Sequence, residues 1–262
     1  QTLPIHLVKT ASLLRRQFSS IRSQRHWRRN QEEGDELDLE SYINFFGQKD
    51  TLGSKSSVNL YQKLMAQNRD LASLVLADLS LSTQAGINDE IQVIDVIKDS
   101  LYLFAECLEE THDQFALYGF NSQKRERVDF LKIKAFNEKY SPLIRGNIHQ
   151  IRPGYYTRMG AAIRHASQIL QKQKQQKKVL LLLSDGKPND LDQYDGRYGL
   201  EDTRQAIKEA KQLGLITFCI TIDQQAEAYL PYIFGRNGYA CIKNIEELPK
   251  ALPELYAQLT EF

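Results

Sequence analysis

The chain has 262 residues, of which 42% are hydrophobic and 26% are charged, and its formal net charge is +1. These values are typical of a globular protein with a sizeable core. They argue against a protein built on wholesale neutralisation of nucleic-acid phosphates, and no apolar run approaches the roughly 18–20 residues that cross a bilayer.

The three cysteines, Cys107, Cys219 and Cys241, are far apart in the chain and lie in apolar runs. Such spacing fits neither a disulfide framework nor a zinc site, and buried free thiols indicate a reducing compartment. The first residues also lack the pattern of a secretory signal peptide. We therefore expect a cytoplasmic protein without a membrane span.

Residues 1–56 differ from the rest and are expected to form a helical arm. Residues 1–30 carry seven Lys/Arg and no acid, whereas six acids lie within residues 32–40. Apolar residues at helical spacing predict a basic amphipathic helix, at Leu7, Leu13, Leu14, Phe18 and Ile21. A second short helix is expected from residue 38. Such a basic helix can bind a membrane surface or nucleic acid, but the neighbouring acids favour an arm that packs on its own domain.

Residues 57–262 alternate short β-rich runs with helical patterns. Strands are expected at residues 71–77, 114–120, 127–133, 179–183, 215–222 and 239–242. Helices are expected at residues 91–110, 157–173, 201–213 and 245–259. This alternation predicts a doubly wound, mostly parallel α/β sheet flanked by helices.

Three polar clusters fall where a predicted strand ends or a predicted helix begins. Asp78, Ser80 and Ser82 follow the first apolar strand, Thr157 begins a helix, and Asp185 follows the second wholly apolar strand. Open α/β sheets bind ligands at the carboxyl ends of their strands. Two carboxylates and three hydroxyls are hard oxygen ligands that suit Mg²⁺. Each cluster alone is more often a helix cap, but in this order they predict one Mg²⁺ site, which Mn²⁺ or Ca²⁺ can also occupy.

The charge balance of this site indicates adhesion rather than catalysis. If hydroxyls ligate the cation directly and the aspartates mostly hydrogen-bond its waters, the open face of the cation stays under-neutralised. That face then attracts an Asp or Glu carboxylate of a partner protein. We therefore expect a metal-dependent protein-binding site and no catalytic residue.

The three clusters read D-L-S-L-S, T-R-M-G and S-D-G. In this order they resemble the von Willebrand factor A (VWA) family and its metal-ion-dependent adhesion site. The resemblance implies that Ser80, Ser82 and Thr157 ligate the metal. It also implies that Asp78 and Asp185 act on the metal directly or through water.

Longer stretches resemble a narrower group of bacterial VWA proteins, the NorD/CbbO group. The stretches are residues 153–166, 184–199, 201–203 and 234–236. This resemblance extends over about residues 30–262 and implies a VWA domain at residues 57–262.

Proteins of the NorD/CbbO group are adaptors for MoxR-type AAA+ ATPases of the NorQ/CbbQ kind. The resemblance therefore implies an ATPase partner and a client enzyme whose Asp or Glu meets the metal. That client is Rubisco for CbbO-type proteins and nitric oxide reductase for NorD-type proteins, and the sequence does not decide between them. No phosphate-loop motif occurs in this chain, so the ATPase is expected to be a separate protein. A stand-alone VWA interaction module is the alternative.

Further charged residues near the predicted site are candidates for partner contacts. They are Arg158, His165, Lys187, Asp190 and Asp192. A plain alternative exists for each: His165 can be an ordinary helix histidine, and the acidic loop can be a solvated connection. A calcium loop is rejected, because Asp195 stands where its turn glycine belongs.

Enzymatic alternatives lack required residues. A phosphatase of the haloacid-dehalogenase kind needs a second carboxylate two residues after Asp78, where Ser80 stands. The sequence also lacks the G-x-G-x-x-G of dinucleotide enzymes and the G-x-S-x-G of serine hydrolases. A metal-dependent phosphatase therefore remains the weaker alternative to a binding protein.

Overall fold

The computed structural model describes residues 2–22, 25–47, 59–66, 70–84, 92–191, 194, 196–221, 223, 225–242, 255 and 259–260. It consists of two compact units. One unit comprises Gln1–Phe18 and Asp70–Phe262, and the other comprises Ser19–Arg69. This division differs from the boundary at residue 56 expected from the sequence, because the first helix packs on the larger unit.

The larger unit is built on a six-stranded sheet in the order β6-β5-β4-β7-β8-β9. Its strands are β4 (Leu71–Asp78), β5 (Gln114–Gln123), β6 (Arg127–Lys134), β7 (Lys177–Ser184), β8 (Ile216–Thr221) and β9 (Tyr239–Cys241). Neighbouring strands are parallel except in the β5–β6 hairpin. The predicted mostly parallel sheet is confirmed.

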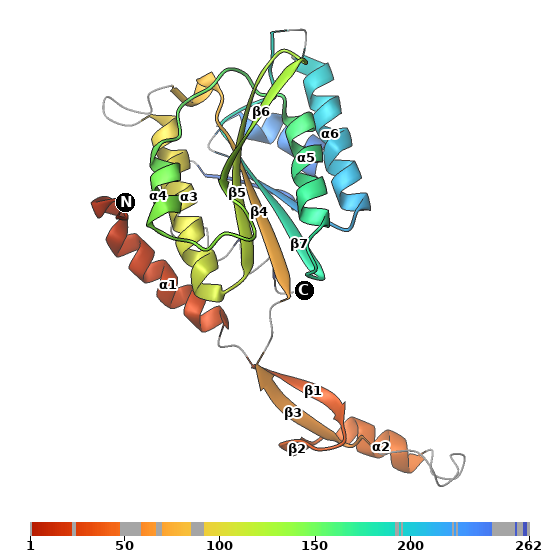
Figure 1. Ribbon diagram of the computed structural model, residues 1–262. Coiled ribbons are helices and arrows are strands. Elements are labelled where there is room, and N and C mark those ends of the chain that lie inside the picture. The colour runs from red at the N-terminus through yellow and green to blue at the C-terminus, as the bar shows by residue number, and fades with distance from the viewer. Residues whose placement is uncertain are drawn as a thin grey trace. The chain divides into compact units, whose positions relative to one another are not determined.

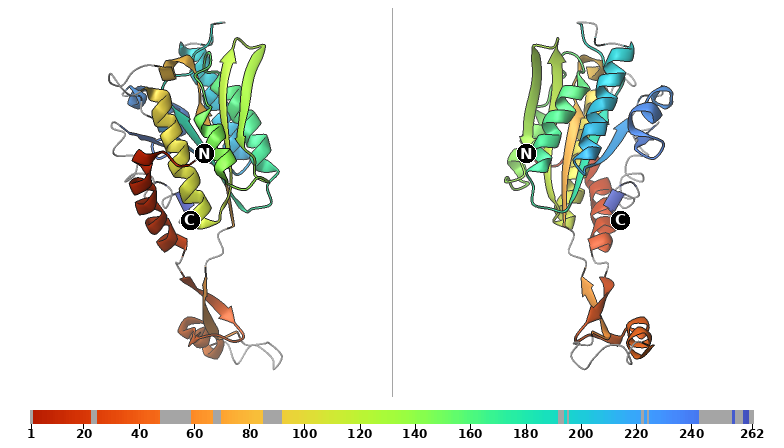
Figure 2. Two further views of the ribbon diagram at one scale, coloured as in Figure 1. Left: turned by 60° about the vertical axis from the view of Figure 1, so that its left-hand side comes forward. Right: turned by 90° about the vertical axis from the view of Figure 1, so that its right-hand side faces the viewer.

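Helices cover both faces of this sheet. α3 (Val93–Thr111) and α4 (Pro142–His149) lie on one face, and α5 (Met159–Gln171) and α6 (Gly196–Gln212) lie on the other (Figures 1 and 2). A short helix, α7 (Leu230–Phe234), precedes β9. The helix expected at residues 245–259 lies almost entirely outside the described residues.

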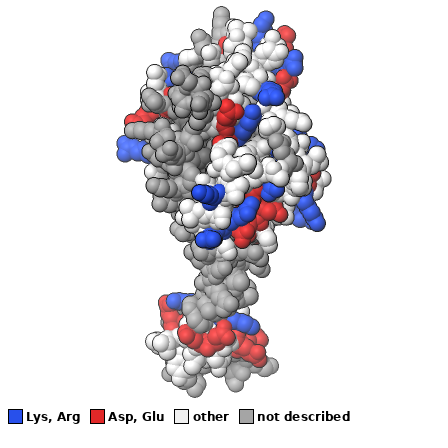
Figure 3. All heavy atoms as spheres, turned by 90° about the vertical axis from the view of Figure 1, so that its left-hand side faces the viewer, with Lys and Arg blue, Asp and Glu red and all other residues white. Residues whose placement is uncertain are grey.

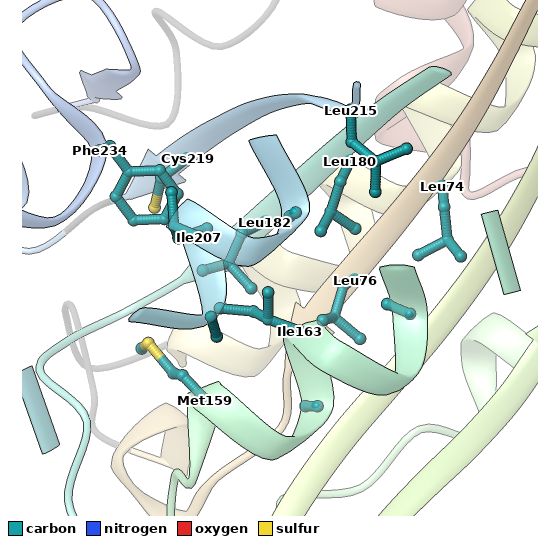
Figure 4. Packing of buried hydrophobic residues seen from close by; sticks show 14 of the residues in the cluster. Leu74, Leu76, Met159, Ile163, Leu180, Leu182, Ile207, Leu215, Cys219 and Phe234 are labelled. Atoms are coloured by element: carbon teal, nitrogen blue, oxygen red, sulfur yellow. The ribbon is translucent and has the colours of Figure 1, made fainter. Parts of the chain in front are cut away.

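The central strands β4 and β7 are buried because successive side chains face the two helical layers in turn. Leu74 and Leu76 of β4 join Leu180 and Leu182 of β7 in one apolar cluster with α5 and α6 (Figure 4). Each fully buried leucine stabilises the fold by about 1.5–3 kcal/mol. The continuous apolar runs that predict these strands therefore reflect burial on both faces.

The first helix, α1 (Val8–Arg22), packs its apolar side on the larger unit. Its buried positions, with one from the preceding 3₁₀ turn, are Leu7, Ala11, Leu14 and Phe18. Arg15 of α1 also donates through Nε to the buried carboxylate of Glu106 on α3, at 3.0 Å. The predicted amphipathic helix is thus present. Around this part of the larger unit, basic and acidic side chains lie in mixed groups among uncharged ones (Figure 3).

The smaller unit combines strands with one helix. It contains β1 (Arg25–Gln31), β2 (Glu36–Leu37), α2 (Leu39–Gly47) and β3 (Tyr61–Ala66), and its antiparallel sheet has the order β1-β3-β2. Asp38 caps α2 by accepting hydrogen bonds from the Ser41 hydroxyl at 2.8 Å and the Ser41 amide at 3.4 Å. The sequence suggested a wholly helical arm, so these strands are a correction. Their charged sequences show no apolar alternation, and their pairing depends on residues some thirty positions apart.

Within the described parts of the chain, no helix has the length and apolar character needed to span a membrane.

Candidate metal centre

The predicted ligands gather where β4 and β7 end. From β4 the chain crosses to β5 on one side, whereas β7 leads to β8 and β9 on the other side. The loops that leave β4 and β7 therefore lead to opposite sides of the sheet (Figure 1). Open α/β sheets bind ligands at such a switch point, beyond the carboxyl ends of the strands. Asp78 and Ser184 are the last residues of the two strands.

Asp78 lies at this switch point and is fully buried. Its Oδ1 accepts hydrogen bonds from the Ser80 amide at 3.0 Å and the Thr157 hydroxyl at 3.2 Å. Its Oδ2 accepts one from the Ser184 hydroxyl at 3.3 Å. These contacts bring together the ends of two strands and the residue before Arg158, the N-cap of α5.

The two serines of the D-x-S-x-S run lie side by side near the second aspartate. The hydroxyl oxygens of Ser80 and Ser82 are 2.8 Å apart. A hydrogen bond from Ser82 reaches the carboxylate of Asp185. The other carboxylate oxygen of Asp185, Oδ1, is buried and has no hydrogen-bond partner among the described residues. A buried, unpaired carboxylate oxygen is costly, and a bound cation is one group that would satisfy it.

The electrostatics around Asp78 and Asp185 also favour a cation. Burial, followed by repulsion from Asp185, raises the pKa of Asp78 to about 7. Burial raises the pKa of Asp185 as well, against the hydrogen bond from Ser82, and the nearby Asp223 adds to the rise. Two buried carboxylates that repel each other form a stable pair when a divalent cation lies between them.

The structure therefore brings together Asp78, Ser80, Ser82, Thr157 and Asp185, and their donor set fits Mg²⁺. Among the described residues no group of three or more His, Cys, Asp or Glu side chains is arranged to hold a metal, so the fit depends on the hydroxyl donors. The sequence reading missed the hydroxyl of Ser184. Its hydrogen bond to Asp78 depends on the register of β4 and β7, which the sequence does not reveal.

Two of the five candidate contact residues lie inside the domain. The side chain of Asp190 is 0% exposed and that of Arg158 is 10% exposed, and the two form an ion pair with Nε and Oδ2 3.4 Å apart. Their burial favours a structural role over the direct partner contact expected from the sequence.

The other candidates differ in position. Lys187 is exposed beside Asp185, with its ammonium 5.4 Å from the centre of the Tyr229 ring. His165 is exposed on α5, where its ring meets Phe130 of β6 edge-on at 4.6 Å. Asp192 lies outside the described residues. Of these three residues, only Lys187 is close in the chain to a predicted ligand, two residues after Asp185.

Comparison with known proteins agrees with the fold described above. The family model of the von Willebrand factor type A domain matches residues 74–258. Over 98% of its length the chain is 52% identical to an uncharacterised protein of Pseudomonas aeruginosa, of which it covers 42%. Over 94% of its length it is 50% identical to protein NorD of Stutzerimonas stutzeri, of which it covers 40%. The chain thus spans about two fifths of the length of these relatives.

Solved structures share the fold at much lower sequence identity. The PilB minor pilin from Streptococcus sanguinis matches with a TM-score of 0.60 and 16% identity, over 79% of this chain and 66% of the pilin chain. This likeness concerns the fold alone. Together with the family match and the NorD relatives, it confirms the fold and the resemblance predicted from the sequence. The chain belongs to the von Willebrand factor type A domain family.

Proposed function

We propose that this chain is a non-catalytic, Mg²⁺-dependent protein-binding domain that links a MoxR-type AAA+ ATPase to a client enzyme. The observation that carries the proposal is the buried, unpaired Oδ1 of Asp185, a carboxylate close enough to Asp78 to raise the pKa of that residue. A cation satisfies that oxygen and offsets the repulsion between Asp78 and Asp185.

The donor set suits adhesion. Ser80, Ser82 and Thr157 would ligate Mg²⁺ through neutral hydroxyls, and Asp78 and Asp185 would act directly or through water. The bound ion supplies an electrophilic point that attracts an external carboxylate. Ser80 and Thr157 are buried, whereas Ser82 is exposed, so a partner carboxylate would reach the ion from the side of Ser82.

Exposed apolar side chains occur close in sequence to the proposed ligands and their loop. Leu81, between the two serine ligands, is 46% exposed, and its amide donates to the Tyr155 carbonyl at 2.7 Å. Tyr155 and Leu191 are also exposed. A partner acid flanked by apolar residues would therefore meet both the metal and an apolar rim.

The relatives favour one client. A match to NorD supports nitric oxide reductase over Rubisco as the client, and a NorQ-like ATPase as the partner that binds another surface. Because the chain covers only part of NorD, the ATPase contact and the client contact are proposals for the protein that contains this domain.

The test uses Ser80→Ala combined with Ser82→Ala in the full protein. This variant removes two neutral ligands but no core group, so we expect it to keep ATPase binding in a pull-down and to lose client activation. The loss of one charge-assisted contact predicts about 10- to 150-fold weaker client binding. The matched control is Ser100→Ala with Ser167→Ala, whose hydroxyls bond backbone carbonyls within α3 and α5. Client activation at the wild-type level by the double ligand variant would exclude the adhesion mechanism.

A further inference from the structure

Asp190 lies in the loop that follows β7, and its buried side chain holds this loop in place through hydrogen bonds. The buried carboxylate of this residue accepts hydrogen bonds from the Ser122 hydroxyl at 2.8 Å, the Lys124 amide at 2.8 Å and the Leu191 amide at 2.7 Å. It also accepts one from Nε of Arg158 at 3.4 Å. One acidic side chain thus joins the turn of the β5–β6 hairpin, its own loop and the start of α5.

A second set of contacts continues from Arg158 to α6. The Arg158 guanidinium lies 4.1 Å from the centre of the Tyr194 ring. The Tyr194 hydroxyl donates to Asp202 and accepts from the Gly160 amide at 3.2 Å. A Cβ at Gly160 would lie 2.0 Å from Oδ2 of Asp202, so glycine is required for this approach. Arg164 also donates to Asp202, at 2.8 Å.

These contacts lead directly to two predicted metal ligands. Thr157 and Asn189, the neighbours of Arg158 and Asp190, exchange backbone hydrogen bonds at 2.8 and 3.0 Å. Tyr156 and Ser122 exchange a second pair at 2.7 and 2.8 Å. Asp190 therefore completes a set of contacts that fixes the position of the Thr157 backbone. The loop that contains Asp190 begins with the predicted ligand Asp185.

We propose that Asp190 is a positioning residue for the metal centre and acts together with Arg158 and Tyr194. It does not contact the metal itself. This inference rests on the proposed metal site. The buried carboxylate of Asp190 holds residues 185–191 against the start of α5, so that Asp185 and Thr157 keep the spacing that Mg²⁺ requires. Groups that orient metal ligands typically control metal affinity by 10–100-fold.

The decisive variant is Asp190→Asn, which keeps the size of the side chain but replaces one acceptor oxygen with a donor. We expect Mn²⁺, titrated into the full protein and followed by its paramagnetic resonance signal, to bind about 10–100-fold more weakly. Tyr194→Phe keeps the ring beneath Arg158 and removes only the hydroxyl, and we expect it to weaken Mn²⁺ binding to a smaller degree. Ser122→Ala removes a single donor and carries the test if Asp190→Asn does not fold.

Two controls separate positioning from general destabilisation and from failure of the metal site. Asp113→Asn alters another buried carboxylate, bonded to Thr111 at 2.9 Å before the amino end of β5, and we expect it to leave Mn²⁺ affinity unchanged. Asp78→Asn removes a predicted ligand and should abolish binding. All titrations are made below the unfolding temperature of every variant.

The outcomes distinguish the two proposals. Wild-type Mn²⁺ affinity in folded Asp190→Asn, with binding lost in Asp78→Asn, would overturn the positioning role and leave the metal site standing. An equal loss in Asp190→Asn and Asp113→Asn would also overturn it, because the effect would then follow from stability alone. Unchanged binding in Asp78→Asn would instead remove the metal site itself.

Discussion

Lys134 at the end of β6 shows how one residue can compensate for an irregularity in a sheet. Lys134 pairs with Leu117 of β5, and the register of the β5–β6 pair shifts between Leu117 and Tyr118. Its ammonium donates to the backbone carbonyl of Phe115 at 2.6 Å and lies 4.0 Å from the centre of the Phe115 ring. The side chain thus supplies a donor where the ladder is irregular.

This environment predicts a pH dependence of stability. Burial, which outweighs the attraction of nearby glutamates, lowers the pKa of Lys134 from 10.5 to about 8. Between these values the unfolded chain holds a proton that the folded chain lacks, so the free energy of unfolding rises with pH from about 8 to about 10.5 and is flat below. Urea unfolding of wild type and Lys134→Met at several pH values measures the difference. The advantage of wild type should grow over this window, and exposed Lys139→Met should show no such trend.

The residues of the candidate metal centre could be proposed from sequence because each stands next to a strong local signal. Asp78 and Asp185 come at the ends of mostly apolar strands, and Thr157 begins a helical pattern. The structural roles of Arg158 and Asp190 could not be predicted, because their partners lie 32 and 68 positions away along the chain and depend on the path of a loop. An acidic loop residue is usually exposed, and only the completed fold shows its burial.

At the scale of elements, α1 is attached to the larger unit through one face. Leu14 is 0% exposed, whereas its neighbour Leu13 is 53% exposed. Glu106, the partner of Arg15, is also bonded by Nη2 of Arg145 on α4 at 2.7 Å. A single buried carboxylate therefore joins α1 to α4, and the apolar contacts supply most of the attachment energy.

This geometry predicts opposite results for two adjacent leucines. Leu14→Ala leaves a cavity under α1 and should reduce the free energy of unfolding by about 2–5 kcal/mol. Leu13→Ala changes an exposed position and should stay within about 0.5 kcal/mol of wild type. Urea unfolding gives both values, and amide hydrogen exchange locates the change in α1. Equal effects of the two substitutions would show that the helix is not docked through Leu14.

The predictability of the other elements depends on how much of their sequence pattern is local. Apolar runs in the sequence predict the buried strands β4 and β7, and apolar residues at helical spacing predict α3. The elements β1, β2, β3, α4 and α7 were missed, because pairing and packing with distant segments stabilise them. α6 begins at Gly196 rather than at the expected residue 201, and its first turns lie against the loop that Tyr194 anchors.

For the whole molecule, the two repelling aspartates link metal binding to stability. At 100 times its dissociation constant, Mg²⁺ should stabilise the fold by about 2.7 kcal/mol, which raises Tm by several degrees in a protein of this size. Asp78→Asn removes both the ligand and the repulsion with Asp185. We expect this variant to unfold at or above the Tm of metal-free wild type and to gain nothing from Mg²⁺. Thermal unfolding with and without Mg²⁺ at constant ionic strength measures this, and an equal Mg²⁺ response in both proteins would contradict it.

The buried ion pair of Asp190 and Arg158 changes how a mutational footprint of the partner should be interpreted. An alanine scan of the charged residues near the site would score both residues as hot spots although both side chains are buried. Exposed Lys187, by contrast, carries an amine that can be labelled without disturbing the interior. Chemical cross-linking from Lys187, rather than loss of binding at Asp190, is therefore the observation that locates where a bound protein lies.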